Sequence, residues 1–134
     1  MGEKEVGSVL VLNRLVFDRI EFHRLGMKND REIKFKIQVG ISRKEEPELY
    51  CVSLILNGNK DDEYSLEIGL NGYFSFNSSE TVSDGEKKAL IQKNAVAIMM
   101  PYLRSQLSLL TAQPEVDCVV LPPFNINKMM EKSD

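Results

Sequence analysis

Apolar and polar residues alternate along the first half of the chain in the period-two pattern of half-buried β-strands. Residues 9–24 form one such run, whose phase changes between Phe17 and Ile20 and predicts a β-bulge near Asp18 and Arg19. After a turn at residues 26–30 the alternation is regular, and its apolar face consists of Ile33, Phe35, Ile37, Val39 and Ile41. These two runs predict the first two strands.

Two further runs predict a hairpin. After a charged turn at residues 43–47, residues 49–56 are almost wholly apolar and end at Asn57-Gly58-Asn59, a strong turn signal. From Tyr64 to Phe76 apolar side chains again occupy nearly every second position. The economical arrangement of these four consecutive strands is an antiparallel meander.

The second half of the chain carries the pattern of helices. Ser83 and Glu86 have the spacing of a capping box, so a helix is expected over about residues 84–111. Pro101 lies inside this segment and predicts a kink or a break, because proline removes a backbone donor and clashes with the preceding turn. Beyond an extended Pro-rich stretch, a short helix is expected at about residues 125–132.

The middle of the long helix is apolar around its whole circumference from Ala95 to Leu103. Such a helix must be covered on more than one side. One four-stranded sheet covers one side, so the other side is expected to meet a second subunit. The expected oligomer interface is formed by Ile98, Met99, Tyr102 and Leu103.

Length and composition fit one folded domain. The chain has 134 residues, of which 43% are hydrophobic and 28% are charged, as in ordinary globular proteins. The predicted fold class is α+β over residues 1–134, with a four-stranded antiparallel sheet followed by a long Pro-kinked helix and a short C-terminal helix. The start of the chain fits neither a signal peptide nor a membrane span, which predicts a cytoplasmic protein with no membrane insertion.

No residue pattern points to catalysis, a nucleotide or a metal. Phosphate-binding glycine motifs are absent, and the only histidine, His23, has no nucleophile motif to accompany it. Cys51 and Cys118 are isolated and cannot supply a four-ligand zinc site with one histidine. The acidic run at residues 61–63 is interpreted as a solvated hairpin tip. The sequence therefore predicts a protein that is not an enzyme and has no cofactor or metal.

Charge is unevenly distributed along the chain. Residues 1–44 hold ten Lys and Arg against six Asp and Glu, whereas residues 45–134 hold seven against fourteen. The basic residues of the first part alternate with apolar residues, without the glycine or aromatic pattern of nucleic-acid-binding modules. We interpret them as a solvated face, and we expect no nucleic-acid partner.

The segments at residues 98–104 and 121–126 resemble signatures of the SecB family of export chaperones. Residues 98–104 are similar to I-x-x-P-Y-x-R in the central helix of the family, and residues 121–126 to its L-x-P-x-N-[FI] crossover. Residues 20–22 and 32–37 resemble the first two strands. The resemblance covers about residues 9–130. It implies a dimer of dimers with the kinked helices at its centre, and a holdase that binds unfolded polypeptides or preproteins in apolar grooves between the sheet and the last helix. The missing phosphate motif predicts that it works without ATP.

The resemblance also implies the client-binding residues. In the second strand and the crossover they correspond to Ile33, Phe35, Ile37, Leu121, Pro123 and Phe124. Met129 and Met130 are added as candidates, because methionine suits surfaces that accept many partners. The strand residues are equally well explained as parts of the sheet core.

The sequence departs from the family in the acidic sheet patch that docks the export motor SecA. Arg19 and His23 occupy positions of this patch, and only Glu67 keeps an acidic side chain as a SecA contact. SecA binding is therefore expected to be weak or absent. Two alternatives to a general export chaperone stay open: a dedicated chaperone for the antitoxin of a toxin–antitoxin system, and a non-chaperone interaction module that uses the same groove.

Overall fold

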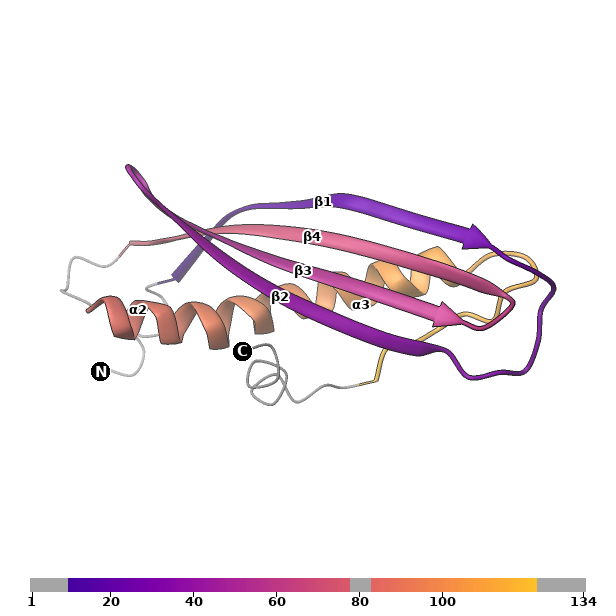
Figure 1. Cartoon of the computed structure of the whole chain (residues 1–134). Helices are drawn as coiled ribbons and strands as arrows, with labels where there is room; N and C mark the ends of the chain where they lie inside the picture. Colours follow the sequence, from indigo (N-terminus) through magenta and orange to yellow (C-terminus); the bar gives the residue numbers. More distant parts are fainter. Residues whose placement is uncertain (1–9, 78–82, 123–134) are drawn as a thin grey trace.

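The protein consists of a four-stranded antiparallel sheet with one long helical rod along one face (Figure 1). The computed structural model describes residues 10–77 and 83–122. The strands are β1 (Leu10–Arg24), β2 (Lys34–Glu45), β3 (Glu48–Lys60) and β4 (Tyr64–Phe76). The rod consists of α2 (Asp84–Leu90), the π-helical turn η1 (Ile91–Ala95) and α3 (Val96–Thr111). The predicted α+β class is confirmed, and the expected helix at about residues 125–132 lies outside the described residues.

The order of the strands is β1-β4-β3-β2, so the predicted meander is wrong. β1 pairs with β4, and the connection after β1 crosses the end of the sheet to reach β2 at the opposite edge. This is the Greek-key order read in the reverse chain direction. Alternation of apolar residues reports which face of a strand is buried, but it does not report which strand lies beside it.

The predicted β-bulge in β1 is confirmed. The pairing of β1 with β4 shifts register between Phe17 and Arg19, and a second shift that was not expected lies between Leu12 and Arg14. Each extra residue reverses the phase of alternation. The bulges therefore keep apolar residues on the helical side along the whole length of β1.

The hairpin between β3 and β4 lies further along the chain than predicted. Asn57 and Gly58 are paired within β3, and the turn follows Lys60, where Asp62 has a φ of 66°. A Cβ atom on Gly58 would lie 3.0 Å from Leu66 Cδ1 and 3.3 Å from Phe35 Cε1. The glycine therefore serves close packing rather than a turn, and the turn signal was misread.

The core forms between the rod and the two central strands. Helix-facing side chains of β3 and β4, among them Leu54, Leu56, Ile68, Leu70 and Phe74, are fully buried together with Met99, Leu103 and Leu107 of α3. Gly72 allows the closest approach, since a Cβ atom there would lie 2.8 Å from Met99 Sδ. The predicted capping box starts the rod, with Ser83 and Glu86 each accepting a hydrogen bond from the other's backbone N–H.

Pro101 does not break the helix as expected. α3 continues through it to Thr111, and the irregular turn of the rod is η1 instead. The carbonyl that loses its donor to Pro101 belongs to Ala97. Ala97 and Pro101 are both exposed, so water can reach the freed carbonyl.

A buried carboxylate holds the connection between β1 and β2. Glu63 is fully buried. Its Oε1 accepts a hydrogen bond from the Asn29 backbone N–H at 2.8 Å and lies 2.9 Å from Lys60 Nζ. The carbonyl of Glu63 accepts the N–H groups of Leu25 at 2.8 Å and Gly26 at 3.2 Å. The expectation of a fully solvated hairpin tip is therefore wrong for Glu63, which joins the crossing segment to the β3–β4 turn.

We expect Glu63→Gln to destabilise the protein and to change its response to acid. The hydrogen bond from Asn29 and the ammonium of Lys60 hold the pKa of Glu63 below its ordinary value. A lowered pKa contributes stability that is present above the unfolded-state pKa, about 4.3, and is lost as the pH falls through the lower folded-state value. Urea unfolding at neutral and acidic pH should show a lower midpoint for the variant at neutral pH and a smaller loss on acidification.

Glu32→Gln provides the control, because Glu32 is exposed near the same connection. It should leave both midpoints close to those of the unmodified protein. An unchanged neutral midpoint for Glu63→Gln would show that the carboxylate does not hold the connection.

Candidate functional site

The sheet is wider than the rod that covers it. α3 packs mainly on β3 and β4, and η1 packs on β3. The edge strands β1 and β2 extend beyond this contact on either side (Figure 1). Apolar side chains on the helical side of the edge strands are therefore incompletely covered.

On β2 these side chains form a continuous apolar strip, which we call the β2 strip. Its members are Ile33, Phe35, Ile37, Val39 and Ile41, of which the first four are half-buried and Ile41 is 36% exposed. Their neighbours across the ladder are covered far better: Leu56 pairs with Ile37, Leu54 pairs with Val39, and both leucines are fully buried. The three client-binding residues predicted for this strand thus lie together at an edge of the sheet, and the alternation pattern already contained Val39 and Ile41.

The structure places Leu121 in the core, not in an open groove. Its side chain is 1% exposed, and its carbonyl accepts a hydrogen bond from Arg104 Nε at 3.3 Å. The segment before it is fixed along α3, because Ser108 Oγ donates to the Val119 carbonyl at 2.9 Å. Leu121 is therefore unavailable to a client in this arrangement. The other predicted client-binding residues, Pro123, Phe124, Met129 and Met130, lie outside the described residues.

The apolar segment from Ala95 to Leu103, which we call the apolar belt, divides between two faces of the rod. Met99 and Leu103 are fully buried against the sheet of the same chain, so they are not available as interface residues. Ile98 and Tyr102, one turn apart, are 37% and 48% exposed on the side away from the sheet. The predicted oligomer interface is reduced to these two residues, because the sheet already covers the other two.

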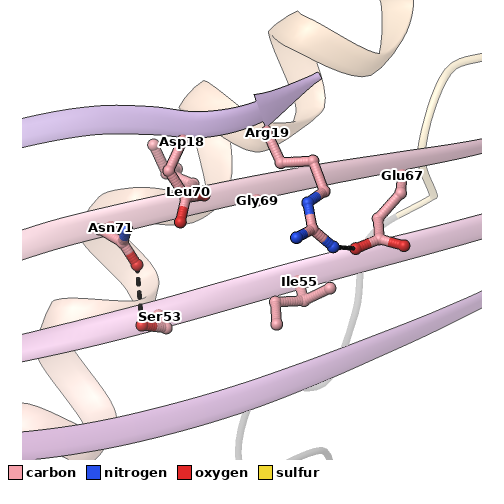
Figure 2. Close-up of a pocket in the computed structure, with 8 residues that line it drawn as sticks. All are labelled: Asp18, Arg19, Ser53, Ile55, Glu67, Gly69, Leu70 and Asn71. Carbon is pink, nitrogen blue, oxygen red and sulfur yellow. Dashed lines mark hydrogen bonds and ion pairs between the residues drawn. The ribbon is translucent and has the colours of Figure 1, made fainter. Parts of the chain in front are cut away.

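The face of the sheet opposite the rod is polar and contains a small cavity of about 120 Å³ (Figure 2). Arg19 on β1 reaches over the cavity to hydrogen-bond with Glu67 on β4, and Ser53 Oγ donates to Asn71 Oδ1 at 2.7 Å on its other side. The absence of a side chain on Gly69 leaves room for the bulge residue Asp18, whose Oδ1 would lie 2.5 Å from an added Cβ atom. The cavity is therefore a product of the β-bulge and a glycine.

The residues compared with the SecA-docking patch lie together on this outer face. Besides its bond with Glu67, Arg19 lies 3.7 Å from Glu21 through Nε, and His23 Nε2 lies 3.5 Å from Glu21 Oε1. Each carboxylate therefore has a basic neighbour. The face presents a mixed, internally paired set of charges rather than an acidic patch.

A second ionic contact, which the sequence did not reveal, joins the start of the rod to the sheet. Glu48 Oε1 lies 2.8 Å from Lys87 Nζ, and its Oε2 lies 2.9 Å from Arg43 Nη2 and accepts the Tyr50 hydroxyl at 3.2 Å. The hydrogen bond from Lys87 lowers the pKa of Glu48. Since α2 contributes no fully buried residue, this contact is a main attachment of the first turns. Lys87 and Glu48 are 39 residues apart in sequence, so no local pattern could have indicated their contact.

Other kinds of site find no support in the described part of the chain. Among residues 10–77 and 83–122, no group of three or more His, Cys, Asp or Glu side chains is placed to hold a metal ion. No helix within these residues is long and apolar enough to cross a membrane. The partly covered β2 strip and the exposed side of α3 are therefore the leading candidate surfaces.

Comparison with known proteins supports the fold resemblance. No protein family model matches the chain. An uncharacterized protein of Methanocaldococcus jannaschii is 27% identical over 127 residues, which cover 90% of this chain and 74% of that protein. The structure is similar to a SecB-like chaperone of Mycobacterium tuberculosis, solved in complex with a ChAD peptide from the HigA1 antitoxin, with a TM-score of 0.73 and 11% identity over 91% of this chain and 95% of that one. The chain thus has the fold of a SecB-like chaperone, as the resemblance implied.

Lysine should destabilise the protein far more at Met99 than at Ile98. Met99→Lys places an ammonium group in the core and is expected to cost on the order of 3 kcal/mol or more of unfolding free energy. Ile98→Lys, the matched control on the exposed side, should cost less than about 1 kcal/mol. Urea unfolding at low protein concentration, where assembly contributes least, measures both. Equal costs would contradict the division of the belt.

Proposed function

We propose that this protein is an ATP-independent holdase that binds extended apolar segments of unfolded polypeptides along the β2 strip. The observation that supports this most directly is the partial exposure of the strip beside fully buried neighbours on β3. A similar fold in a SecB-like chaperone solved with a bound peptide gives independent support.

The strip offers two kinds of interaction to an unfolded chain. Burying its exposed apolar surface would contribute roughly 25 cal/mol per Å². β2 pairs on one side only among the described residues, so its other side can add backbone hydrogen bonds, as in other complexes in which a peptide extends a sheet. In this proposal Ile33, Phe35 and Ile37 contact the client, and Pro123, Phe124, Met129 and Met130 remain candidates for further contacts. Neither interaction requires a nucleotide.

A dedicated chaperone for one antitoxin is the second candidate. The related fold in Mycobacterium tuberculosis was solved with an antitoxin peptide, which favours this narrower role. The pairing of Glu67 with Arg19 favours it as well, because a carboxylate that is already paired is a poor match for the SecA docking used in general export. Binding of SecA is therefore expected to be weak.

Self-association is the remaining part of the proposal. Ile98 and Tyr102 form an apolar stripe on α3 that nothing within the described part of this chain covers. Exposed apolar patches of this kind mark protein interfaces. We therefore propose that the rods of neighbouring subunits pack together through this stripe, in a dimer of dimers.

The double substitution Phe35→Ser with Ile37→Ser should reduce holdase activity several-fold, because both side chains contribute to the β2 strip. Activity is measured as suppression of light scattering when an unrelated denatured protein is diluted into buffer, and added ATP should change nothing. Leu109→Ser is the matched control, since Leu109 is also apolar, is 69% exposed and lies on α3 instead of β2.

Two outcomes would contradict the holdase. The first is failure of the unmodified protein to suppress aggregation wherever it is folded, and the second is suppression that requires ATP hydrolysis. Unchanged activity of the double variant, with circular dichroism showing an intact fold, would place the client site elsewhere.

The protein is expected to be a tetramer, or at least a dimer, in solution. Multi-angle light scattering should give a mass above that of one 15.2 kDa chain. Ile98→Glu combined with Tyr102→Glu should lower this mass, since it places four carboxylates at each twofold contact of the stripe. Met27→Glu, at a side chain that is 87% exposed in the connection after β1, should leave the mass unchanged. A monomeric mass for the unmodified protein would contradict the proposed assembly.

A further inference from the structure

We propose that the preferred client segment is an extended strand in which apolar residues alternate with acidic residues, and that it pairs with the free edge of β2. This inference rests on the proposed function and specifies the chemistry of the segment that the β2 strip accepts. Three features of the structure carry it: the regularity of the β2 edge, the charge of its outer side, and the period of a β-strand.

β2 is the regular edge of the sheet. Its pairing with β3 runs without a register shift from Lys34 to Glu45, whereas β1, at the other edge, has register shifts after Leu12 and Phe17. A β-bulge interrupts the hydrogen-bonding row of an edge and opposes strand addition. An extended segment can therefore form a longer uninterrupted ladder on β2 than on β1.

The outer side of β2 is basic although the whole chain is acidic. The outward-facing positions from Lys34 to Lys44 hold three lysines and no acidic residue, whereas the chain has a net charge of −3. Lys34 and Lys36 alternate with the apolar residues and so point away from the rod, and Lys44 has the same parity along the strand. The described residues provide one partner for them, Asp61, at 3.7 Å from Lys34, and this pair is largely exposed. Lys36 and Lys44 have no ion pair within the described part of the chain.

The alternation of side chains along a strand relates the regular edge and the basic outer side of β2 to a preferred client sequence. Successive side chains of a strand added to β2 point to opposite faces of the sheet. Those on the helical side would cover the β2 strip, and those on the outer side would lie about 5 Å from Lys34 and Lys36, the usual spacing of cross-strand pairs. Opposite charges are favourable in such pairs and like charges are unfavourable. Acidic residues at every second position therefore match the outer side, and basic residues are disfavoured there.

Lysines on an edge strand can also serve only to prevent edge-to-edge aggregation. That role and the proposed one differ in a measurable way. Protection against aggregation requires charge of either sign, whereas selection of an acidic client requires positive charge at these positions.

The test uses two fluorescent peptides, each about seven residues long. They share the same apolar residues at alternate positions and carry either Glu or Lys at the others. Fluorescence anisotropy should show that the Glu peptide binds roughly fivefold more tightly at low salt, and added salt should reduce the difference.

Lys34→Glu combined with Lys36→Glu should reverse the order of the two peptides. Lys88→Glu combined with Lys93→Glu, at two exposed lysines of the rod, changes the net charge equally and should preserve the order.

Backbone pairing is tested separately with the Glu peptide. Methylation of its amide nitrogens at alternate positions removes the N–H groups along one side of the strand and leaves every side chain in place. One of the two methylation patterns should abolish the fluorescence change, because it removes the donors that face β2, and the other should be tolerated. Equal tolerance of both patterns would overturn strand pairing.

The charge outcomes separate this inference from the function on which it rests. Equal affinity for both peptides, or an order unaffected by the Lys34 and Lys36 substitutions, overturns the inference while suppression of aggregation upholds the holdase. If neither peptide binds and no denatured protein is held, both proposals fail. Tighter binding of a single-stranded oligonucleotide than of the Glu peptide would show that the basic edge serves nucleic acid instead.

Discussion

The order of the strands depends on a buried ionic contact at one end of the sheet. The connection after β1 must pass the β3–β4 turn to reach the far edge, and Glu63 holds it there through Asn29 and Lys60. Arg24 extends the contact, with Nη1 at 3.5 Å from Glu63 and Nη2 donating to the Glu115 carbonyl at 2.8 Å. The crossing segment and the chain after α3 are thus fixed at the same end. A buried carboxylate is costly unless it is fully paired, so this contact tolerates few alternative arrangements.

Placing β2 at an edge has a direct consequence for function. One helical rod can cover about two strands, and the core accordingly lies between α3 and the central strands β3 and β4. β2 carries the same alternating apolar pattern as a half-buried strand, yet no helix of the described residues lies fully over it. Partial exposure of the strip is therefore a result of the topology and does not require unusual residues. The surface that we propose for client binding is thus an apolar sheet face that the helical rod covers only in part.

Much of this architecture could be predicted from sequence, and the failures share one cause. Alternation of apolar residues identified the four strands and the bulge after Phe17, and the spacing of Ser83 and Glu86 identified the capping box, because all of these are local patterns. It could not supply the strand order or the burial of Glu63, which depend on contacts between distant residues. The Asn57-Gly58 turn signal failed because tertiary packing against Leu66 also demands a glycine. The belt of α3 was apolar on every side, and only the fold shows that the sheet covers Met99 and leaves Ile98 exposed.

The charged residues on the outer side of β2 differ from those on the outer face of β1 and β4. On the outer face Arg19 pairs with both Glu21 and Glu67, and His23 lies beside Glu21, so the two carboxylates already have basic neighbours within the sheet. Among the described residues, Lys34 has one largely exposed partner in Asp61, and Lys36 and Lys44 have none, so their charge can both repel a second edge and attract an acidic segment. Because charge acts mainly on encounter and orientation while apolar burial supplies most of the affinity, the two sides of one strand can divide these tasks. Selectivity then requires no dedicated pocket, only a strand that is apolar on one side and basic on the other.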